Sequence, residues 1–240
     1  MAFESVTLVV PCFNEAGALG ALRDRLAPVT DELGRLTRLQ VVLVDDGSVD
    51  ATYAELKIHL SALPQARVEI VKHEANRGLT RALSTAAGVA TGDVVCTIDS
   101  DCTYDPVEIF GLLELMGRTG ADIVTGSPYH PRGGVENVES WRLALSKGAS
   151  RMYSLVLPKR LYCYTSMFRA YRREWYRQEW LTAQNFVGVT EILARAILAG
   201  ARVEEYPVIL RRRQFGESKM KVGRAMREHL KMMGRLAVRR

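Results

Sequence analysis

The chain has 240 residues, a length that one compact α/β domain can fill. Hydrophobic residues make up 48% of it and charged residues 25%, which is typical of a globular protein with a buried core and excludes disorder over most of the length. The formal net charge is +6, and Lys and Arg are concentrated toward the C-terminal end, so we expect contact with phosphate-bearing ligands or an anionic membrane surface. No nucleic-acid-binding motif accompanies this charge, so we expect no nucleic-acid partner.

The N-terminal segment and the cysteines indicate the compartment. No basic leader precedes the first apolar run, and no run reaches the roughly 20 apolar residues that cross a bilayer. The four cysteines form no C-x-x-C pair, and their spacing suits neither a zinc site nor a disulfide framework. We therefore expect a cytoplasmic protein that is neither exported nor membrane-spanning.

In chain order, short apolar and β-branched runs alternate with segments in which apolar residues recur at helical spacing. The runs in the first half predict strands at residues 6–10, 40–44, 67–71, 94–98 and 123–125. Strands of this kind separated by helices predict a Rossmann-like, mostly parallel sheet that helices cover on both faces. The predicted fold class is therefore α/β.

The second half of the chain is less regular. Its patterns predict a loop at 128–134, helices at 141–157 and 189–199, and strands at 164–171 and 202–210. The last segment, 220–240, predicts a basic amphipathic helix whose apolar stripe consists of Val222, Met226, Leu230, Met233 and Ala237.

Acidic and turn-forming residues follow three of the predicted strands. In chain order they are Pro11, Phe13, Glu15, Asp45, Asp46, Asp99, Ser100 and Asp101. The carboxyl ends of parallel strands meet at one edge of the sheet, where ligands of such folds bind. Carboxylates gathered there are costly unless they meet hydrogen-bond donors or a cation. The pattern therefore predicts a ligand that is rich in hydroxyls or carries a cation.

Asp99 and Asp101 form the most specific pair in this group. Mg²⁺ and Mn²⁺ prefer carboxylate oxygens, and Mg²⁺ commonly binds one or two carboxylates together with substrate phosphates. We therefore expect Asp99 and Asp101 to hold Mg²⁺ or Mn²⁺ at the end of the fourth strand. The alternative is an Asx turn or a helix cap before Pro106.

Taken together, these motifs resemble a known family. PCFNEA, VLVDDGSVD, NRG at 76–78 and DSD at 99–101 resemble the inverting glycosyltransferases of family 2, which have the GT-A fold. TSMFRAYRREW at 165–175 and FGESKMK at 215–221 are similar to the branch that makes dolichyl- or polyprenyl-phosphate mannose. The resemblance implies a catalytic domain at residues 1–215, followed by a basic loop and the amphipathic helix at 216–240.

The resemblance also implies roles for the strand-end residues. Those after the first two strands would contact the base and ribose of a nucleotide, while Asp99, Ser100 and Asp101 would meet the ribose, the diphosphate and the metal. Arg213 and Lys219 match basic residues that clasp the diphosphate or the acceptor phosphate. A guanidinium can bind phosphate oxygens bidentately, and an ammonium acts as a point charge.

Two of these assignments have alternatives. Glu191 matches an acidic position near the acceptor, where it would take the proton of an alcohol acceptor; a lipid phosphate is already anionic and needs no such base. The alternative is a glutamate on the face of a helix. For the arginines at 211–213, the alternative is a solvated run of charge.

The implied reaction is displacement at the anomeric carbon with inversion, in which the metal, Arg213 and Lys219 stabilise the departing nucleoside diphosphate. GDP-mannose is the favoured donor and UDP-glucose the second; polyprenyl phosphate is the favoured acceptor. Two alternatives remain open: the same fold acting on a soluble hydroxyl acceptor, and a non-catalytic protein that binds nucleotide sugars.

The sequence departs from the branch at several positions. Pro128 stands where the branch usually has Arg, Cys163 and Met167 replace an acid and a glycine, and Thr103 stands where some relatives place a metal-binding Gln. These departures leave open which acceptor is used and how it is held.

The terminal helix suggests a location. An apolar stripe beside Lys and Arg suits an anionic leaflet, which predicts peripheral attachment at the inner face of the membrane. The alternative is that the helix packs on its own domain or on the partner in a homodimer.

Overall fold

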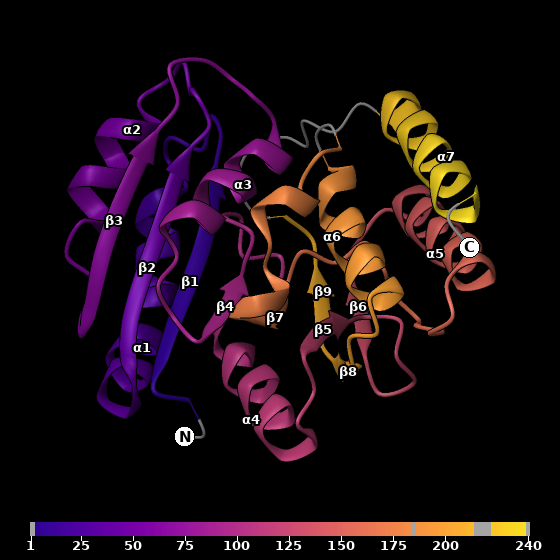
Figure 1. The fold of residues 1–240 in the computed structure, drawn as a ribbon. Coiled ribbons are helices and arrows are strands. Elements are labelled where there is room, and N and C mark those ends of the chain that lie inside the picture. The colour runs from indigo at the N-terminus through magenta and orange to yellow at the C-terminus, as the bar shows by residue number, and fades with distance from the viewer. Residues whose placement is uncertain (1–2, 184–185, 214–221, 239–240) are drawn as a thin grey trace.

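A seven-stranded sheet forms the centre of the protein, in the order β3-β2-β1-β4-β7-β5-β8 (Figure 1). The computed structural model describes residues 3–183, 186–213 and 222–238. The strands are β1 (Ser5–Cys12), β2 (Arg38–Asp45), β3 (Ala66–Lys72), β4 (Val94–Thr97), β5 (Ile123–Ser127), β7 (Arg169–Arg172) and β8 (Val203–Pro207). All neighbours are parallel except β7, which runs antiparallel to both β4 and β5. A second sheet pairs β6 (Gly134–Glu136) in parallel with β9 (Ile209–Arg211).

Helices cover both faces of the large sheet (Figure 1). One face is covered by α1 (Leu19–Leu36), a π-helical turn (Leu56–Leu60) that continues α2 (Thr52–Glu55), and α4 (Ile109–Thr119), which follows a 3-10 turn at Pro106–Glu108. The other face is covered by α3 (Leu79–Val89) and α6 (Val187–Leu198), with α7 (Val222–Val238) beside α6 and α5 (Ser140–Val156) beside α7. Short 3-10 turns at Arg173–Trp175 and Gln178–Trp180 connect β7 to α6.

Burial on both faces explains the apolar strands. In β1, Val6 and Leu8 pack into the core on the α1 side, whereas Val9 packs into the core on the α3 side, and all three are fully buried. Successive side chains of a strand point to opposite faces, so a strand covered on both faces has a continuous apolar sequence. The predicted strands of the first half and the mostly parallel sheet are confirmed.

The second half differs from the prediction in two places. The single strand predicted at 202–210 is wrong, because β8 and β9 belong to different sheets and the chain leaves the large sheet after Pro207, a residue that has no N–H to donate. The strand predicted at 164–171 begins only at Arg169, because the preceding residues form a loop that lines the cleft described below.

The terminal helix packs on its own domain. Met232 and Met233 are 5% and 7% exposed and belong to the core on the α6 side, and His229 Nδ1 lies 2.9 Å from Tyr153 Oη of α5. The predicted boundary between residues 215 and 216 lies outside the described residues. None of the helices within the described ranges has the length and hydropathy needed to cross a bilayer.

Candidate active site

Parallel pairing brings the acidic strand ends to one edge of the sheet. Cys12 at the end of β1 is in register with Asp45 at the end of β2, and Val9 is in register with Thr97 at the end of β4. A cleft of about 1090 Å³ opens at this edge. Of the residues predicted from the sequence, the cleft is lined by Pro11, Phe13, Glu15, Asp46, Asp99, Ser100, Asp101 and Arg213.

Asp99 and Asp101 occupy the turn that follows β4. The Asx turn considered above is present, because Thr103 N–H donates to Asp101 Oδ1 at 3.1 Å, and it leaves Asp101 Oδ2 facing Arg213. Burial, together with the charge of Asp101, raises the pKa of Asp99 to about 8. The two carboxylates repel each other, and a divalent cation bound between them would remove this repulsion. Carboxylate oxygens are the hard ligands that such cations prefer.

The rest of the coordination sphere would come from outside the protein. Among the described residues, no group of three or more His, Cys, Asp or Glu side chains surrounds one point. A cation held by Asp99 and Asp101 would therefore take its remaining ligands from water or phosphate, as Mg²⁺ does when it binds together with a substrate diphosphate.

Arg213, from the C-terminal half of the chain, places a positively charged guanidinium next to these acids. Its Nη2 donates to Glu15, its Nε lies 3.5 Å from Asp101 Oδ2, and its side chain is only 17% exposed. Burial lowers the pKa of Arg213, but the hydrogen bond to Glu15 and the charges of the surrounding carboxylates raise it above its ordinary value. Arg213 is therefore part of the cleft and not of a solvated charge run.

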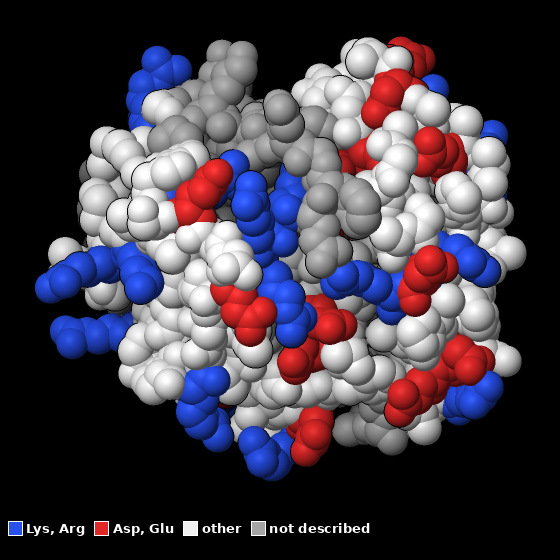
Figure 2. Space-filling model, turned by 180° about the vertical axis from the view of Figure 1, so that it is seen from behind, with Lys and Arg blue, Asp and Glu red and all other residues white. Residues whose placement is uncertain are grey.

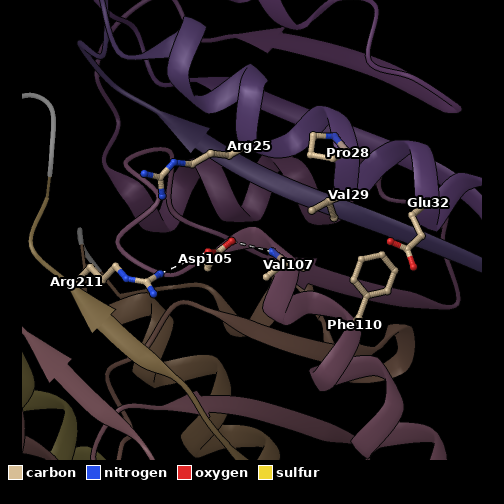
Figure 3. Close-up of a pocket in the computed structure, with 8 residues that line it drawn as sticks. All are labelled: Arg25, Pro28, Val29, Glu32, Asp105, Val107, Phe110 and Arg211. Atoms are coloured by element: carbon tan, nitrogen blue, oxygen red, sulfur yellow. Dashed lines mark hydrogen bonds and ion pairs between the residues drawn. The ribbon is translucent and has the colours of Figure 1, made fainter.

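Arg211 faces a second, smaller pocket of about 440 Å³ between α1, α4 and β9 (Figure 3). Its guanidinium lies 3.4 Å from Asp105 and 3.3 Å from Glu136. Its backbone N–H donates to the carbonyl of Thr103 at 2.9 Å. Arg211 therefore ties β9 to the loop that carries Asp101.

Asp46 organises the rim of the cleft. Its carboxylate accepts hydrogen bonds from Asn76 Nδ2 at 2.9 Å and from the backbone N–H groups of Arg77 and Gly78 at 3.0 and 2.7 Å. It also lies 2.7 Å from His73 Nδ1. These contacts hold the NRG segment in place at the start of α3. The hydrogen bonds of the Asp46 carboxylate are therefore used to stabilise the protein's own loop.

Asp45 lies beneath the cleft and does not line it. Its Oδ1 accepts from Ser48 N–H at 3.0 Å, while its Oδ2 is buried and has no hydrogen-bond partner among the described residues. The turn after Asp45 needs a glycine: Gly47 has φ +69°, and a Cβ there would lie 2.1 Å from the backbone of Ala75. Of the two acids, Asp45 is the one with an unused oxygen.

Glu191 and Lys219 stand apart from this group. The structure does not bring Glu191 to the cleft: it accepts hydrogen bonds from the N–H groups of Thr182 and Ala183 at 2.8 and 2.6 Å, and it pairs with Arg195 at 2.8 Å. This arrangement matches the alternative of a helix-face glutamate with a local role. Lys219 lies outside the described residues.

The sequence analysis missed residues at the other end of the cleft. Arg142 of α5 lines it and pairs with Glu139 at 2.7 Å, and Tyr129 lines it with Lys147 Nζ 5.2 Å from its ring centroid. His229 of α7 also lines it, and burial lowers the pKa of this His. Packing of α5 and α7 brings Arg142 and His229 to the cleft, and no motif marked them. Tyr129 instead follows the end of β5, next to Pro128, where the sequence departs from the family motif.

A mostly parallel sheet with one antiparallel strand, and an acidic cleft at the carboxyl ends of β1, β2 and β4, define an α/β protein of the GT-A fold. Residues 7–180 match the profile of glycosyl transferase family 2, and the chain belongs to this family. The resemblance and the fold predicted from the sequence are confirmed.

Several characterised proteins are similar to the chain. It is 31% identical over 233 residues to a dolichol-phosphate mannosyltransferase of Pyrococcus furiosus, covering 96% of the chain and 63% of that protein. It is 31% identical over 219 residues to a polyprenol monophosphomannose synthase of Mycolicibacterium smegmatis, covering 89% of the chain and 80% of that protein. A mannosyltransferase of Pyrobaculum calidifontis, solved with GDP-Man and Mn²⁺, has the same fold with a TM-score of 0.66 at 20% identity, covering 100% of the chain and 65% of that protein. The chain thus spans a little under two thirds of the Pyrococcus protein.

Proposed function

We propose that the chain is a metal-dependent inverting glycosyltransferase that moves a hexose from a nucleotide-diphosphate sugar to polyprenyl phosphate. GDP-mannose is the favoured donor and UDP-glucose the second. The observation that carries the proposal is the meeting of Asp99, Asp101 and Arg213 at one cleft. The names of the Pyrococcus and Mycolicibacterium relatives support the mannose donor and the polyprenyl acceptor.

The donor would lie along the acidic end of the cleft. Asp99 and Asp101 would hold Mg²⁺ or Mn²⁺, which supplies positive charge to the diphosphate as the sugar departs. Arg213 and Lys219 would add charge to the same leaving group, and Pro11 and Phe13 would contact the nucleoside. Asp45, which is buried and does not line the cleft, would have no direct contact with the nucleoside.

The acceptor end of the cleft favours an anion over an alcohol. Among the described residues, the acids that line the cleft are all engaged: Glu15 with Arg213, Glu139 with Arg142, and Asp46 with the NRG segment, while the remaining two are assigned to the cation. Deprotonation of an alcohol would need a general base, and His229, the other side chain at this end that could act as one, already lies within hydrogen-bond distance of Tyr153. A phosphate acceptor needs none, and Arg142 at this end supplies a guanidinium suited to phosphate oxygens.

The chemical step then balances without a base. An anionic oxygen of the acceptor phosphate attacks the anomeric carbon, the bond from that carbon to the diphosphate oxygen breaks, and its electron pair leaves with the nucleoside diphosphate. Glu191 has no part in this step. We place the reaction at the inner face of the cytoplasmic membrane, where the basic residues of α7 suit an anionic surface.

The test is transfer from radiolabelled GDP-mannose or UDP-glucose in the presence of Mn²⁺ or EDTA. We expect a lipid-linked product with polyprenyl phosphate in detergent, and no product with EDTA. Transfer to soluble alcohols alone would favour the alternative acceptor. Donor binding without turnover would favour a non-catalytic nucleotide-sugar-binding protein.

A further inference from the structure

Four polar residues form a row across four neighbouring strands of the large sheet, β4, β7, β5 and β8 (Figure 1). Each is in register with the next, and in chain-neighbour order across the sheet they are Thr97, Arg169, Thr125 and Glu205. In each strand, the residue two positions before or after belongs to the core on the α6 side. Because side chains alternate between the two faces of a strand, all four members of the row face α6. We call these four residues the polar row.

Glu205 is the member of the polar row at the edge of the sheet. Its Oε2 accepts a hydrogen bond from Tyr162 N–H at 2.8 Å, and its Oε1 accepts one from Cys163 N–H at 3.0 Å. Many Asp and Glu side chains on the face shown in Figure 2 lie beside Lys or Arg side chains. Glu205 differs from them, because among the described residues it forms no ion pair and both of its oxygens bind the backbone of the loop at 161–168. Hydrogen bonds to an ionised acceptor are stronger than neutral ones, so Glu205 fixes the start of this loop.

The other members of the polar row hold the rest of the loop. Arg169 donates to the backbone carbonyl of Tyr164 at 3.0 Å, and the hydroxyl of Thr97 donates to the carbonyl of Met167. Arg169 also donates to Thr125 Oγ1 at 3.0 Å, which connects the row across β7 and β5. The N–H groups at the start of the loop therefore meet an acceptor, and the carbonyl groups further along meet donors. Backbone groups paired in this way hold the loop in one conformation.

The loop at 161–168 forms a wall of the cleft. Cys163, Thr165, Ser166 and Met167 all line it. Thr165 Oγ1 lies 2.7 Å from Ser146 Oγ of α5, the helix that also lines the acceptor end. A shift of the loop would therefore change the shape of the acceptor end, whereas the acids that follow β1 and β4 would keep their places.

We propose that Glu205 is a positioning residue, which sets the affinity for the acceptor by fixing the loop at 161–168. Glu205 is not among the described residues that line the cleft, so it acts through the loop and not on the substrate. Without its carboxylate, the N–H groups of Tyr162 and Cys163 lose their acceptor, and conformations that expose them to water become more favourable. The identity of the acceptor rests on the proposed function, but the conformation of the loop can be measured without any substrate.

The thiol of Cys163 reports on the loop in the full chain without any substrate. It is 1% exposed, and burial raises its pKa, which keeps it in the less reactive protonated form. We expect iodoacetamide to label Cys163 about tenfold faster in Glu205→Ala than in the wild type, as followed by mass spectrometry. Labelling of Cys96, which is buried in β4, should keep its wild-type rate and shows that the sheet stays folded. Labelling of Cys163 that is unchanged, or that rises only together with that of Cys96, would overturn the proposal.

Steady-state kinetics of the same variants separate positioning from stability. In Glu205→Ala we expect the KM for polyprenyl phosphate to rise about tenfold, with kcat and the donor Kd unchanged. Glu205→Gln, whose amide oxygen can still accept one of the two N–H groups, should recover part of this loss and should also slow the labelling of Cys163.

A matched control and the two assays together distinguish the possible failures. Glu204→Ala changes the preceding residue of β8, whose side chain is 47% exposed and lies 3.9 Å from Lys159 Nζ, and it should alter neither labelling nor KM. An acceptor KM that is unchanged in Glu205→Ala, although Cys163 is labelled faster, would overturn the role of Glu205 in acceptor binding. Faster labelling in Glu205→Ala, with no transfer to polyprenyl phosphate even by the wild type, would contradict the proposed function and support the hold of Glu205 on the loop.

Discussion

Arg213 Nε lies 3.5 Å from Asp101 Oδ2, and the same guanidinium donates to Glu15. This contact joins the C-terminal half of the chain to the acids at the ends of β1 and β4. Because the side chain of Arg213 is 17% exposed, its charge acts in a partly desolvated cleft, where electrostatic interactions are stronger than in water. Arg213 therefore lies beside Asp101, one of the two acids proposed to hold the cation.

Replacement of Asp101 by Asn tests the proposed cation site. An Asn oxygen can still accept the hydrogen bond from Thr103 N–H, so the turn should survive, but the negative charge is lost. We expect Mn²⁺-dependent donor binding to disappear in thermal-shift measurements. We also expect kcat/KM to fall by about 100-fold or more, since loss of even an indirect metal partner costs 10–100-fold. Asp105→Asn, in the same loop but paired with Arg211, is the matched control; equal turnover of Asp101→Asn and wild type would rule out the assignment.

Replacement of Arg213 by Ala tests the clasp on the leaving group. Charge on the diphosphate grows as the sugar departs, so the guanidinium should stabilise the transition state more than the bound donor. We expect kcat to fall about 100-fold while the Kd for the nucleoside diphosphate changes by less than tenfold. Arg213→Lys should recover part of the rate, because it keeps the charge but not the planar pair of donors. Arg35→Ala, a surface change on α1, should have no effect on either constant.

The donor half of the site could be predicted because it depends on local sequence. Runs of apolar residues fix the strands, parallel pairing fixes which ends meet, and the residues directly after those ends must share an edge. The positions of Asp99 and Asp101 could therefore be predicted from the end of β4, which they directly follow. Arg213 was found by its resemblance to a family motif, since no local pattern shows that β9 leads back to the acids.

The acceptor half could not be predicted in the same way. Val189 and Thr190 of α6 line the cleft, but Glu191, about 100° further around the helix, points into the loop at 182–183. The sequence shows that α6 is almost wholly apolar, so its pattern does not say which side faces a ligand. Arg142 and His229 enter the site through the packing of α5 and α7, which no motif records.

The raised pKa of Asp99 predicts a pH dependence of stability. The carboxyl has a pKa of about 8 in the folded protein against an ordinary value of 3.8, so the folded state binds its proton more tightly than the unfolded state does. The contribution of Asp99 to the free energy of unfolding should therefore decrease as the pH rises from about 4 to about 8. In Asp99→Asn this decrease should vanish, so the Tm of the wild type should fall relative to the variant over that interval when both are measured without divalent cations.

The same carboxyl should release a proton when a cation binds. A divalent ion favours the ionised form, so Mn²⁺ with a nucleoside diphosphate should expel the proton of Asp99 at neutral pH. Calorimetric titrations in buffers of different ionisation enthalpy measure this release directly. We expect close to one proton for the wild type and none for Asp99→Asn; equal release from both proteins would show that Asp99 is already ionised.

Substitution of Arg169 should cause a large loss of stability. Its guanidinium is fully buried and donates to Tyr164 O, Thr125 Oγ1, Tyr171 Oη and Val189 O at 3.0, 3.0, 3.0 and 2.7 Å. It thereby joins the loop at 161–168 to β5 and to the start of α6. Arg169→Met should leave these buried acceptors without a donor and reduce the free energy of unfolding by about 3 kcal/mol or more in urea titrations.

Kinetic measurements on the Arg169→Met variant show whether Arg169 also positions the loop at the cleft, in addition to stabilising the fold. Thr165 and Ser166, in the loop that Arg169 anchors, line the cleft, so loosening this loop should raise the KM for the acceptor at temperatures where the variant is still folded. Donor affinity should stay near that of the wild type, because Asp99 and Asp101 follow a different strand. Arg172→Met is the control: Arg172 is only partly buried and donates through Nε to Ala121 O at 3.1 Å, so its loss should cost about 1 kcal/mol. If the KM for the acceptor is unchanged in folded Arg169→Met, the role of Arg169 is to stabilise the core and not to position the acceptor loop.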